Sequence, residues 1–466
     1  MAKPMNDVIV LLPGILGSVL SRGGQDVWAV SGGAVGRMLL SLGHSIGDLA
    51  LKDQSSDPNV NADGVTASRL LDDVHLIPGL WKIDGYTKIS DAIKKNFDVE
   101  PGANFFPFPY DWRRDNRVAA QQLAAQTKTW LTAWRQRPGK QNAKLILLGH
   151  SMGGLVSRYF LEVLDGWRDT RMLITFGTPY FGSLNAVNTL ANGLKVGFGP
   201  LAVDLSPFAQ SLPSLHQLLP TYACYDPGSG TLVHCYDDGA NIPNLDLSKA
   251  KAARKFHSEI EDAVNRHLND NDYMQNRYVI HPIVGRKQQT LQSAVFRNGA
   301  VEMLATYKGT DEEGDGTVPR VSATPKELDG QQREIFAPEL HASLQNSDSV
   351  WVNVEGIVGG LDIHAHAFRA ALPAAKVAVR LVLSDAYPGG KPVTMTVRPD
   401  ESWVDVEAAV VDVVTQKEVQ TSPAQPAGAA ERTVSFAGLQ PGTYRVSVRG
   451  DDVDSVSDVF LVLPPG

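Results

Sequence analysis

The sequence Gly149-His150-Ser151-Met152-Gly153 is the feature that most constrains the fold. It follows an apolar run at 144–148 and precedes residues 155–164, where apolar side chains recur at helical spacing. A serine between a buried strand and a helix, with a glycine two positions away on each side, is typical of the sharp turn that presents a nucleophile above a parallel sheet. We therefore predict that Ser151 is a catalytic nucleophile. The alternative is a glycine-rich turn whose serine is structural.

Other segments predict the sheet to which this turn belongs. Near-continuous apolar runs, typical of strands buried on both faces, occur at residues 8–12, 144–148, 171–176 and 277–285. Helical patterns lie between them at residues 84–97, 118–134 and 155–164. This alternation of strands and helices predicts an α/β fold with a doubly wound, mostly parallel sheet, as in α/β hydrolases.

The character of the chain changes at about residue 374. Short alternating segments follow, separated by Pro, Gly and Asp turns, at residues 377–383, 392–397, 404–414, 432–436, 443–448 and 459–462. Six short strands without a helix predict a small all-β sandwich of immunoglobulin or fibronectin type. We therefore expect an α/β-hydrolase domain at 1–372 and a β-sandwich module at 373–466.

Two segments are longer than a minimal sheet needs. The first, at about 24–80, carries an apolar stripe at helical spacing in residues 37–51, and the second, at about 183–276, is rich in Leu and Phe. Stripes of this kind usually pack inward. The sharper hypothesis is a lid at 24–80 that opens at a lipid surface and a cap at 183–276 that covers an apolar pocket. Plain core packing is the alternative.

A serine nucleophile needs a general base, and the base needs an orienting carboxylate. In this fold the chain order is Ser, then Asp or Glu, then His. Asp315 lies in the tight sequence Gly314-Asp315-Gly316-Thr317-Val318-Pro319 and is the predicted carboxylate. The neighbouring acids compete for the role but are typical of a solvated acidic run; they are Asp311, Glu312 and Glu313.

Three histidines follow Asp315 in the chain. His341 lies between a strand-like segment and a helical start, whereas His364 and His366 lie close to the expected domain boundary. Position therefore favours His341 as the base and leaves His364 and His366 open.

Two backbone N–H groups are expected to bind the developing oxyanion. One is the N–H of Met152, at the start of the helix after the serine. The other is the N–H of Ile15, in the loop Pro13-Gly14-Ile15-Leu16-Gly17 that follows the first strand. The alternative for this loop is an ordinary Pro-Gly turn.

Composition limits partners and location. The 466 residues carry 43 Lys and Arg against 51 Asp and Glu, a net charge of −8, which disfavours nucleic acid as a partner. No His-Glu-x-x-His or Cys-x-x-Cys pattern occurs, so we expect no metal and no cofactor. No signal peptide and no long apolar span are seen, which predicts a cytoplasmic protein. Peripheral membrane contact through the lid is an alternative that the sequence leaves open.

Cys224 and Cys235 are expected as reduced thiols, with a hairpin disulfide as the alternative.

Taken together, the motifs resemble the lecithin:cholesterol acyltransferase family, which includes the lysosomal phospholipase A2 and bacterial relatives. The matching pieces occur in the family's order across about residues 7–365: Leu12-Pro13-Gly14-Ile15-Leu16-Gly17-Ser18, Tyr110-Asp111-Trp112-Arg113, Gly149-His150-Ser151-Met152-Gly153-Gly154, Phe176-Gly177-Thr178-Pro179, Gly314-Asp315-Gly316-Thr317-Val318 and His341-Ala342-Ser343-Leu344. The resemblance implies Ser151 as nucleophile, Asp315 as orienter and His341 as base. The C-terminal module lies outside it.

The resemblance implies a serine hydrolase or O-acyltransferase that acts on lipid or other carboxylic esters, phospholipids among them, through an acyl-serine intermediate. One alternative is a general carboxylesterase or amidase without a lipid interface, whose activity would not rise at the micelle threshold of its substrate. Another is a binding or scaffold protein with an inert hydrolase body, against which the complete Ser, Asp and His set argues. The sequence indicates no partner for the C-terminal module.

Overall fold

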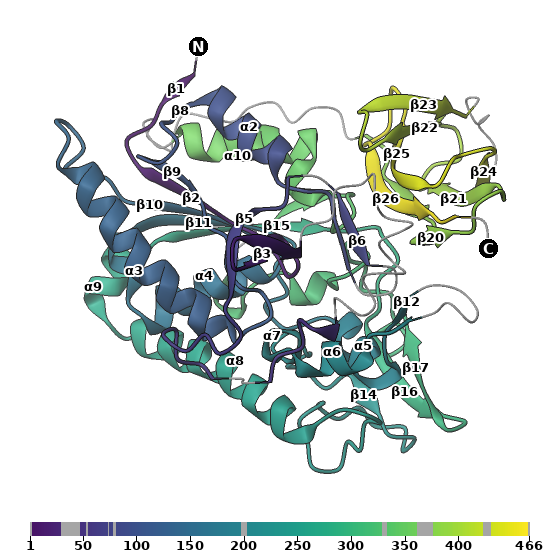
Figure 1. Ribbon diagram of the computed structural model, residues 1–466, viewed down its shortest axis with the longest axis horizontal. Helices are drawn as coiled ribbons and strands as arrows, with labels where there is room; N and C mark the ends of the chain where they lie inside the picture. The colour runs from purple at the N-terminus through teal and green to yellow at the C-terminus, as the bar shows by residue number, and fades with distance from the viewer. Residues whose placement is uncertain are drawn as a thin grey trace.

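A computed structural model of the chain describes residues 2–28, 47–52, 55–72, 74–77, 81–196, 203–328, 333–360, 376–422 and 430–464. Figure 1 shows a large body built on a central sheet and, beside it, a smaller module formed by the C-terminal strands. Within these ranges, the structure contains no helix whose length and apolar character would let it cross a membrane.

The central sheet has six strands, and every neighbouring pair in it is parallel. In order across the sheet, the strands are β18 (Ile335–Ala337), β15 (Val279–Gly285), β11 (Thr170–Phe176), β10 (Leu145–His150), β2 (Val8–Leu12) and β9 (Phe105–Pro107). All residues of β2 and β10 are buried, as expected when both faces of a parallel sheet are covered. The predicted α/β-hydrolase class is therefore confirmed.

Helices cover both faces of this sheet (Figure 1). On one side lie α2 (Thr87–Asn96) and α10 (Asp348–Gly359), and on the other lie α3 (Asn116–Arg135) and α4 (Met152–Val163), with α8 (Leu247–His267) packed on α4. The amphipathic α2 buries Ile89 and Ile93. The Asp115 carboxylate caps α3 by accepting a hydrogen bond from the Arg117 N–H at 2.8 Å.

The described part of the first insertion and the residues that flank it form two small antiparallel sheets. They consist of β3 (Ser18–Arg22), β4 (Gln25–Trp28) and β5 (Val65–Leu70), and of β6 (His75–Ile77) and β7 (Trp81–Ile83). Most of the stripe predicted as a helix at 37–51 lies outside the described residues, although Leu49 is described and buried. The lid at 24–80 therefore stays a prediction.

The second insertion packs tightly on the body. Its elements are α5 (Leu184–Asn192), β12 (Lys195–Val196), β13 (Val203–Asp204), α6 (Ser206–Ser211), α7 (Pro213–His216), β14 (Tyr225–Asp226), α8 and α9 (Asn271–Asn276). Phe208, Leu212 and Leu215 are buried in the same hydrophobic core as the central sheet. Core packing accounts for these side chains, and a cap over an apolar pocket stays a prediction.

Cys224 and Cys235 lie in this insertion and are free thiols. Both side chains are buried, and their Sγ atoms are 3.5 Å apart. Backbone pairing between Tyr225 and Val233 brings the two segments together.

Short elements complete the body. They are β1 (Lys3–Pro4), β8 (Phe97–Asp98), β16 (Ser293–Arg297), β17 (Ala300–Leu304) and the 3₁₀ turns Gly166–Asp169, Arg320–Ser322, Lys326–Leu328 and Leu344–Asn346.

The C-terminal strands form two sheets that enclose a core of their own. One sheet contains β19 (Val379–Val382), β21 (Val393–Pro399) and β24 (Arg432–Phe436), and the other contains β20 (Ala386–Tyr387), β26 (Val456–Val462), β25 (Gly442–Arg449), β22 (Glu407–Asp412) and β23 (Lys417–Thr421). Alternate residues of β21 point into this core, among them Val393 and Met395. The predicted sandwich is confirmed, with β20 and β23 as additional strands. The boundary expected between residues 372 and 373 lies outside the described residues and stays a proposal.

Candidate active site

Ser151 occupies the sharp turn between β10 and α4. Its φ of 52° and ψ of −124° lie in a region that residues other than glycine rarely adopt, at a cost of about 1–3 kcal/mol. Two hydrogen bonds hold the turn: the Ser151 N–H donates to the Phe176 carbonyl oxygen at 2.8 Å, and the Thr178 hydroxyl donates to the Ser151 carbonyl oxygen at 2.9 Å. The strand-to-helix context predicted for Ser151 is therefore present.

His341 lies in the loop after β18, with its ring beside the serine. Its Nε2 is 3.0 Å from the Ser151 Oγ, and its Nδ1 is 2.7 Å from Oδ2 of Asp315. Since a carboxylate only accepts, the proton of a neutral ring sits on Nδ1, and Nε2 presents its lone pair to the serine hydroxyl. The geometry suits proton transfer from the Ser151 Oγ to Nε2 of His341.

Asp315 is held by its own loop. Its Oδ1 accepts hydrogen bonds from the N–H groups of Thr317 at 2.9 Å and Val318 at 2.7 Å, which leaves Oδ2 for the histidine. Ser151, Asp315 and His341 are each at most 2% exposed. The structure thus brings the three predicted side chains together in a buried site.

The competing candidates lie elsewhere or outside the described residues. Glu312 pairs with Arg320, Glu313 pairs with Arg286, and Asp311 accepts a hydrogen bond from the Gln292 amide. His364 and His366 lie outside the described residues.

The predicted oxyanion loop approaches the serine closely. Gly14 and Gly17 close a turn through a 3.1 Å backbone hydrogen bond, and Leu16 in this turn has a φ of 64°. A Cβ on Gly14 would lie 2.9 Å from the Ser151 Cβ, so only glycine fits here. The Ile15 N–H has no acceptor among the described residues, and the Met152 N–H is at the first position of α4, where no intrahelical acceptor exists.

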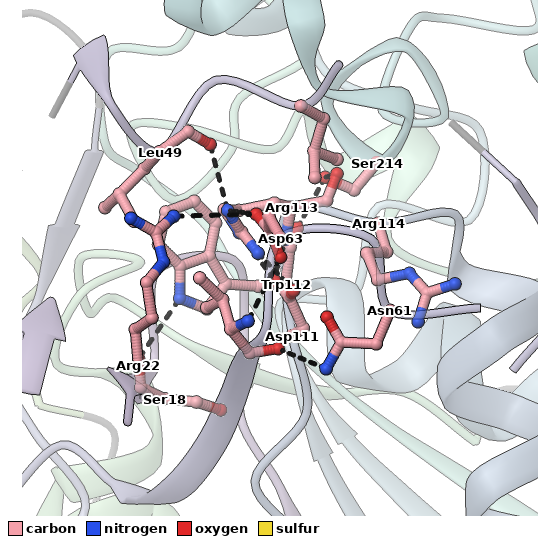
Figure 2. A network of polar contacts seen from close by, with 12 residues as sticks. Ser18, Arg22, Leu49, Asn61, Asp63, Asp111, Trp112, Arg113, Arg114 and Ser214 are labelled. Atoms are coloured by element: carbon pink, nitrogen blue, oxygen red, sulfur yellow. Dashed lines mark hydrogen bonds and ion pairs between the residues drawn. The ribbon is translucent and has the colours of Figure 1, made fainter. Parts of the chain in front are cut away.

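A polar network around Arg113 links the Tyr-Asp-Trp-Arg motif to the first insertion (Figure 2). The fully buried Arg113 guanidinium binds the Asp111 carboxylate through two N–H groups at 2.9 and 2.6 Å, and also binds Asp63 at 2.8 Å and the Leu49 carbonyl oxygen at 3.0 Å. The neighbouring Tyr110 hydroxyl donates to the Pro13 carbonyl oxygen at 2.8 Å. The Tyr-Asp-Trp-Arg motif therefore ties the first insertion and the predicted oxyanion loop to the body.

Sequence reasoning missed three residues at the site. Tyr86 accepts a hydrogen bond from the Gly14 N–H at 2.8 Å and contacts Nδ1 of His150 at 2.8 Å. Gly177 has a φ of 58°, and a Cβ there would lie 2.7 Å from Oδ2 of Asp315. Tyr86 and His150 carry no local signal for this role, whereas the Phe-Gly-Thr-Pro motif marks the position of Gly177.

In the described part of the chain, no group of three or more His, Cys, Asp or Glu side chains is placed to hold a metal ion. A parallel sheet with a buried serine at its strand-to-helix turn and a histidine in contact with that serine defines an α/β hydrolase.

The chain belongs to the lecithin:cholesterol acyltransferase family: the family model described as Lecithin:cholesterol acyltransferase matches residues 50–294, more than half of the chain. A comparison with curated protein sequences finds no match. Membership of this family supports a general activity of the protein as an esterase or acyltransferase that acts on lipid esters.

Among solved structures, the chain is similar to lipase BlEst2 from Bacillus licheniformis. The mature form shows 14% sequence identity and a TM-score of 0.35, with 77% of this chain and 92% of that chain covered. The propeptide form shows 13% identity and a TM-score of 0.38, with 98% of this chain and 93% of that chain covered. An immunoglobulin-like β-sandwich protein from Bacteroides vulgatus shows 16% identity and a TM-score of 0.14, with 19% of this chain and 98% of that chain covered.

Proposed function

We propose that the protein is a serine esterase or O-acyltransferase that transfers the acyl group of a lipid or other carboxylic ester through Ser151. The observation that carries the proposal is the contact of the Ser151 Oγ with Nε2 of His341 at 3.0 Å, with Asp315 at 2.7 Å on the other ring nitrogen. Nucleophile, base and orienter are in hydrogen-bond reach of one another, as acyl transfer requires.

In the first half of the reaction, Nε2 of His341 accepts the serine proton as Oγ attacks the ester carbonyl carbon. The N–H groups of Ile15 and Met152 hold the negative oxygen of the tetrahedral intermediate. The carbon–oxygen bond to the alcohol then breaks, and the imidazolium gives its proton to the leaving alcohol oxygen. An acyl-Ser151 remains.

In the second half, an acceptor attacks the acyl-serine while His341 takes the acceptor's proton. Water gives the free acid, and a second alcohol gives a new ester. The imidazolium returns its proton to the Ser151 Oγ, so atoms and charges balance over the cycle.

Labelling with a fluorophosphonate, followed by peptide mapping, tests the nucleophile. We expect the label on the peptide that contains Ser151 and no label on a Ser151→Ala variant. The control is a Ser157→Ala variant, which changes a buried serine in α4, the helix that follows Ser151. It should label as the wild type does. Label on another residue, or full esterase activity in Ser151→Ala, would contradict the proposal.

Contact with a lipid surface through the insertion at 24–80 belongs to the same proposal. Its support is the buried position of Ser151, which an ester substrate reaches only after the surrounding chain moves. Activity measured below and above the micelle threshold of the substrate tests it, since a general carboxylesterase would show no rise.

A further inference from the structure

The loop that carries His341 lies against the C-terminal module. Glu339, two residues before His341, is buried, and its Oε1 accepts a hydrogen bond from the Ser457 N–H of β26 at 2.9 Å. The next residue, Leu340, packs against the hydrophobic core of the module. The module therefore contacts the two residues that directly precede the proposed general base.

A second contact reaches the same loop through the turn between β7 and α2. The Arg445 guanidinium of β25 donates two hydrogen bonds to Oδ1 of the buried Asp84, the one from Nε at 2.9 Å. The Asp84 N–H donates to the Ala342 carbonyl oxygen at 3.1 Å, and Oδ2 of Asp84 accepts from the Asn346 amide at 3.3 Å. Ala342 and Asn346 follow His341 in the chain, so the module holds the loop on both sides of the base.

The segment that carries the acid is held by the module as well. The side chain of the fully buried Gln288 accepts from the Leu381 N–H at 3.1 Å and donates to the Val379 carbonyl oxygen at 2.9 Å, both in β19. The Gln288 N–H donates to the carbonyl oxygen of Gly314, the residue before Asp315, at 3.0 Å. A buried amide whose hydrogen bonds are made holds the segments that it joins in one arrangement.

The position of the base depends on such contacts. Residues 338–343 belong to no helix or strand, so neighbouring segments determine where the His341 ring lies. Both halves of acyl transfer need this ring within hydrogen-bond reach of the reacting oxygen, as at the 3.0 Å between Nε2 and the Ser151 Oγ. A misplacement of about 1 Å can cost on the order of 100-fold in rate.

We propose that the C-terminal module positions the general base, and that Arg445 is a positioning residue that acts on His341 through Asp84. The proposal rests on the function proposed above. It gives a role to the module, which the family match at residues 50–294 does not cover. Because the module acts on the orientation of His341 and not on the binding of the ester, its contacts should affect kcat and leave KM unchanged.

The main test is Arg445→Met, which removes the guanidinium and keeps an unbranched side chain. We expect kcat for p-nitrophenyl butyrate to fall roughly tenfold or more, with KM within about twofold of wild type. Arg449→Met is the control, because Arg449 lies in the same strand but pairs with Glu407 inside the module; it should change neither value. Arg445→Lys, whose ammonium can still reach Oδ1 of Asp84, should recover most of the lost kcat.

Proton NMR separates positioning from a general loss of stability. The low-field resonance of the Nδ1 proton between His341 and Asp315 reports the geometry of the base. It should shift or broaden in Arg445→Met and stay in place in Arg449→Met and Arg445→Lys. Wild-type kcat in Arg445→Met would overturn the proposal. So would a lower kcat with an unmoved resonance, or equal losses in Arg445→Met and Arg449→Met.

Leu340→Ala decides the question if Arg445→Met does not fold. This variant weakens the contact from the side of the body, because it removes packing against the core of the module. It should lower kcat and move the same resonance, whereas Leu268→Ala, which changes a leucine that is 39% exposed at the end of α8, should do neither. Wild-type kcat and an unmoved resonance in Leu340→Ala would overturn the proposal.

Failure of this proposal and failure of the proposed function give different results. If Ser151→Ala keeps its turnover of p-nitrophenyl butyrate, the proposed function is wrong. If Ser151→Ala is inactive but Arg445→Met and Leu340→Ala keep the wild-type kcat, only the positioning role of the module is wrong.

Discussion

His150 holds the backbone of His341: its Nε2 lies 3.1 Å from the His341 carbonyl oxygen. Burial lowers the pKa of His150 to about 3, so the ring is neutral and carries one N–H. Because the carbonyl oxygen only accepts, this N–H is on Nε2, and Nδ1 accepts from the Tyr86 hydroxyl. The Tyr86 oxygen in turn accepts from the Gly14 N–H. One chain of hydrogen bonds thus joins the predicted oxyanion loop, the serine turn and the histidine loop.

Removal of the Tyr86 hydroxyl should break this chain. In Tyr86→Phe the Gly14 N–H and Nδ1 of His150 lose their buried partner, which costs about 1–3 kcal/mol of stability. The loops they hold can then shift, and we expect kcat to fall roughly 10- to 100-fold. Urea unfolding and ester hydrolysis measure the two effects. The matched change Tyr444→Phe, which removes a hydroxyl bonded to the Gln440 carbonyl oxygen in the module, should leave kcat unchanged. Wild-type kcat in Tyr86→Phe would contradict the role of the Tyr86 hydroxyl in holding these loops.

A methyl group on Gly177 should displace the acid and the base. The Cβ of Gly177→Ala would lie 2.7 Å from Oδ2 of Asp315 and 2.9 Å from Nδ1 of His341. We expect kcat/KM to fall roughly 100-fold. Gly230→Ala is the control, since its φ of 79° imposes similar backbone strain while no atom lies within 4 Å of the new Cβ. Wild-type kcat/KM in Gly177→Ala would contradict this prediction, and an equal loss in Gly230→Ala would show that backbone strain, and not contact with the Asp315–His341 pair, is responsible.

Arg113→Lys should destabilise the fold. A lysine ammonium cannot replace the planar guanidinium that binds Asp111 with two N–H groups and also reaches Asp63 and the Leu49 carbonyl oxygen. The buried acceptors that lose their partner should lower the free energy of unfolding by about 3 kcal/mol, which urea unfolding measures. Arg137→Lys, which changes an exposed ion pair with Glu100, should leave the unfolding midpoint where it is. Equal midpoints for all three proteins would contradict a structural role for Arg113.

Glu339 should make stability depend on pH. Burial, opposed only in part by hydrogen bonds from the N–H groups of Ser457 and Leu340, raises its pKa from the ordinary value of 4.5 to about 8. Because this pKa is raised, the contribution of the Glu339 carboxyl group to stability is full below pH 4.5 and is lost as the pH rises to about 8. In Glu339→Gln the amide oxygen keeps both hydrogen bonds without the buried charge. We therefore expect this variant to gain stability relative to wild type between pH 5 and 9, by on the order of 3 kcal/mol.

Thermal unfolding at a series of pH values checks the prediction. Glu401→Gln, which removes an exposed carboxylate from the C-terminal module, is the control and should parallel the wild type. A constant difference between Glu339→Gln and wild type over this pH range would show that Glu339 does not titrate as described.

The sequence predicts those parts of the fold that carry a local pattern. The apolar run at 8–12 is β2 residue for residue. The Gly-His-Ser-Met-Gly motif locates Ser151 because its glycines serve a turn within five residues. Strand β23 escapes prediction because it is an exposed strand at the edge of its sheet, with the sequence Lys-Glu-Val-Gln-Thr and no buried side to produce alternation.

Contacts between distant segments leave no such pattern. Periodicity identifies Tyr86 only as an apolar position of a helix, whereas its hydroxyl acts on Gly14 and His150, which are 72 and 64 residues away. A cavity lined by His341 likewise leaves no pattern in the sequence, because its wall combines residues of α5, β7 and the C-terminal module. The choice of His341 over His364 and His366 depends on position and family resemblance, since a histidine has the same local signature wherever it lies.

The central claim is that one acyl-Ser151 intermediate serves both water and alcohol acceptors, and product partitioning tests it most directly. Phenyl and p-nitrophenyl butyrate are hydrolysed in the presence of a fixed concentration of glycerol, and the ratio of butyrate to glyceryl butyrate is measured. If both esters form the same acyl-serine, the ratio is the same for the two leaving groups, and Ser151→Ala forms neither product. A ratio that depends on the leaving group, or products formed by Ser151→Ala at the wild-type rate, would contradict the account.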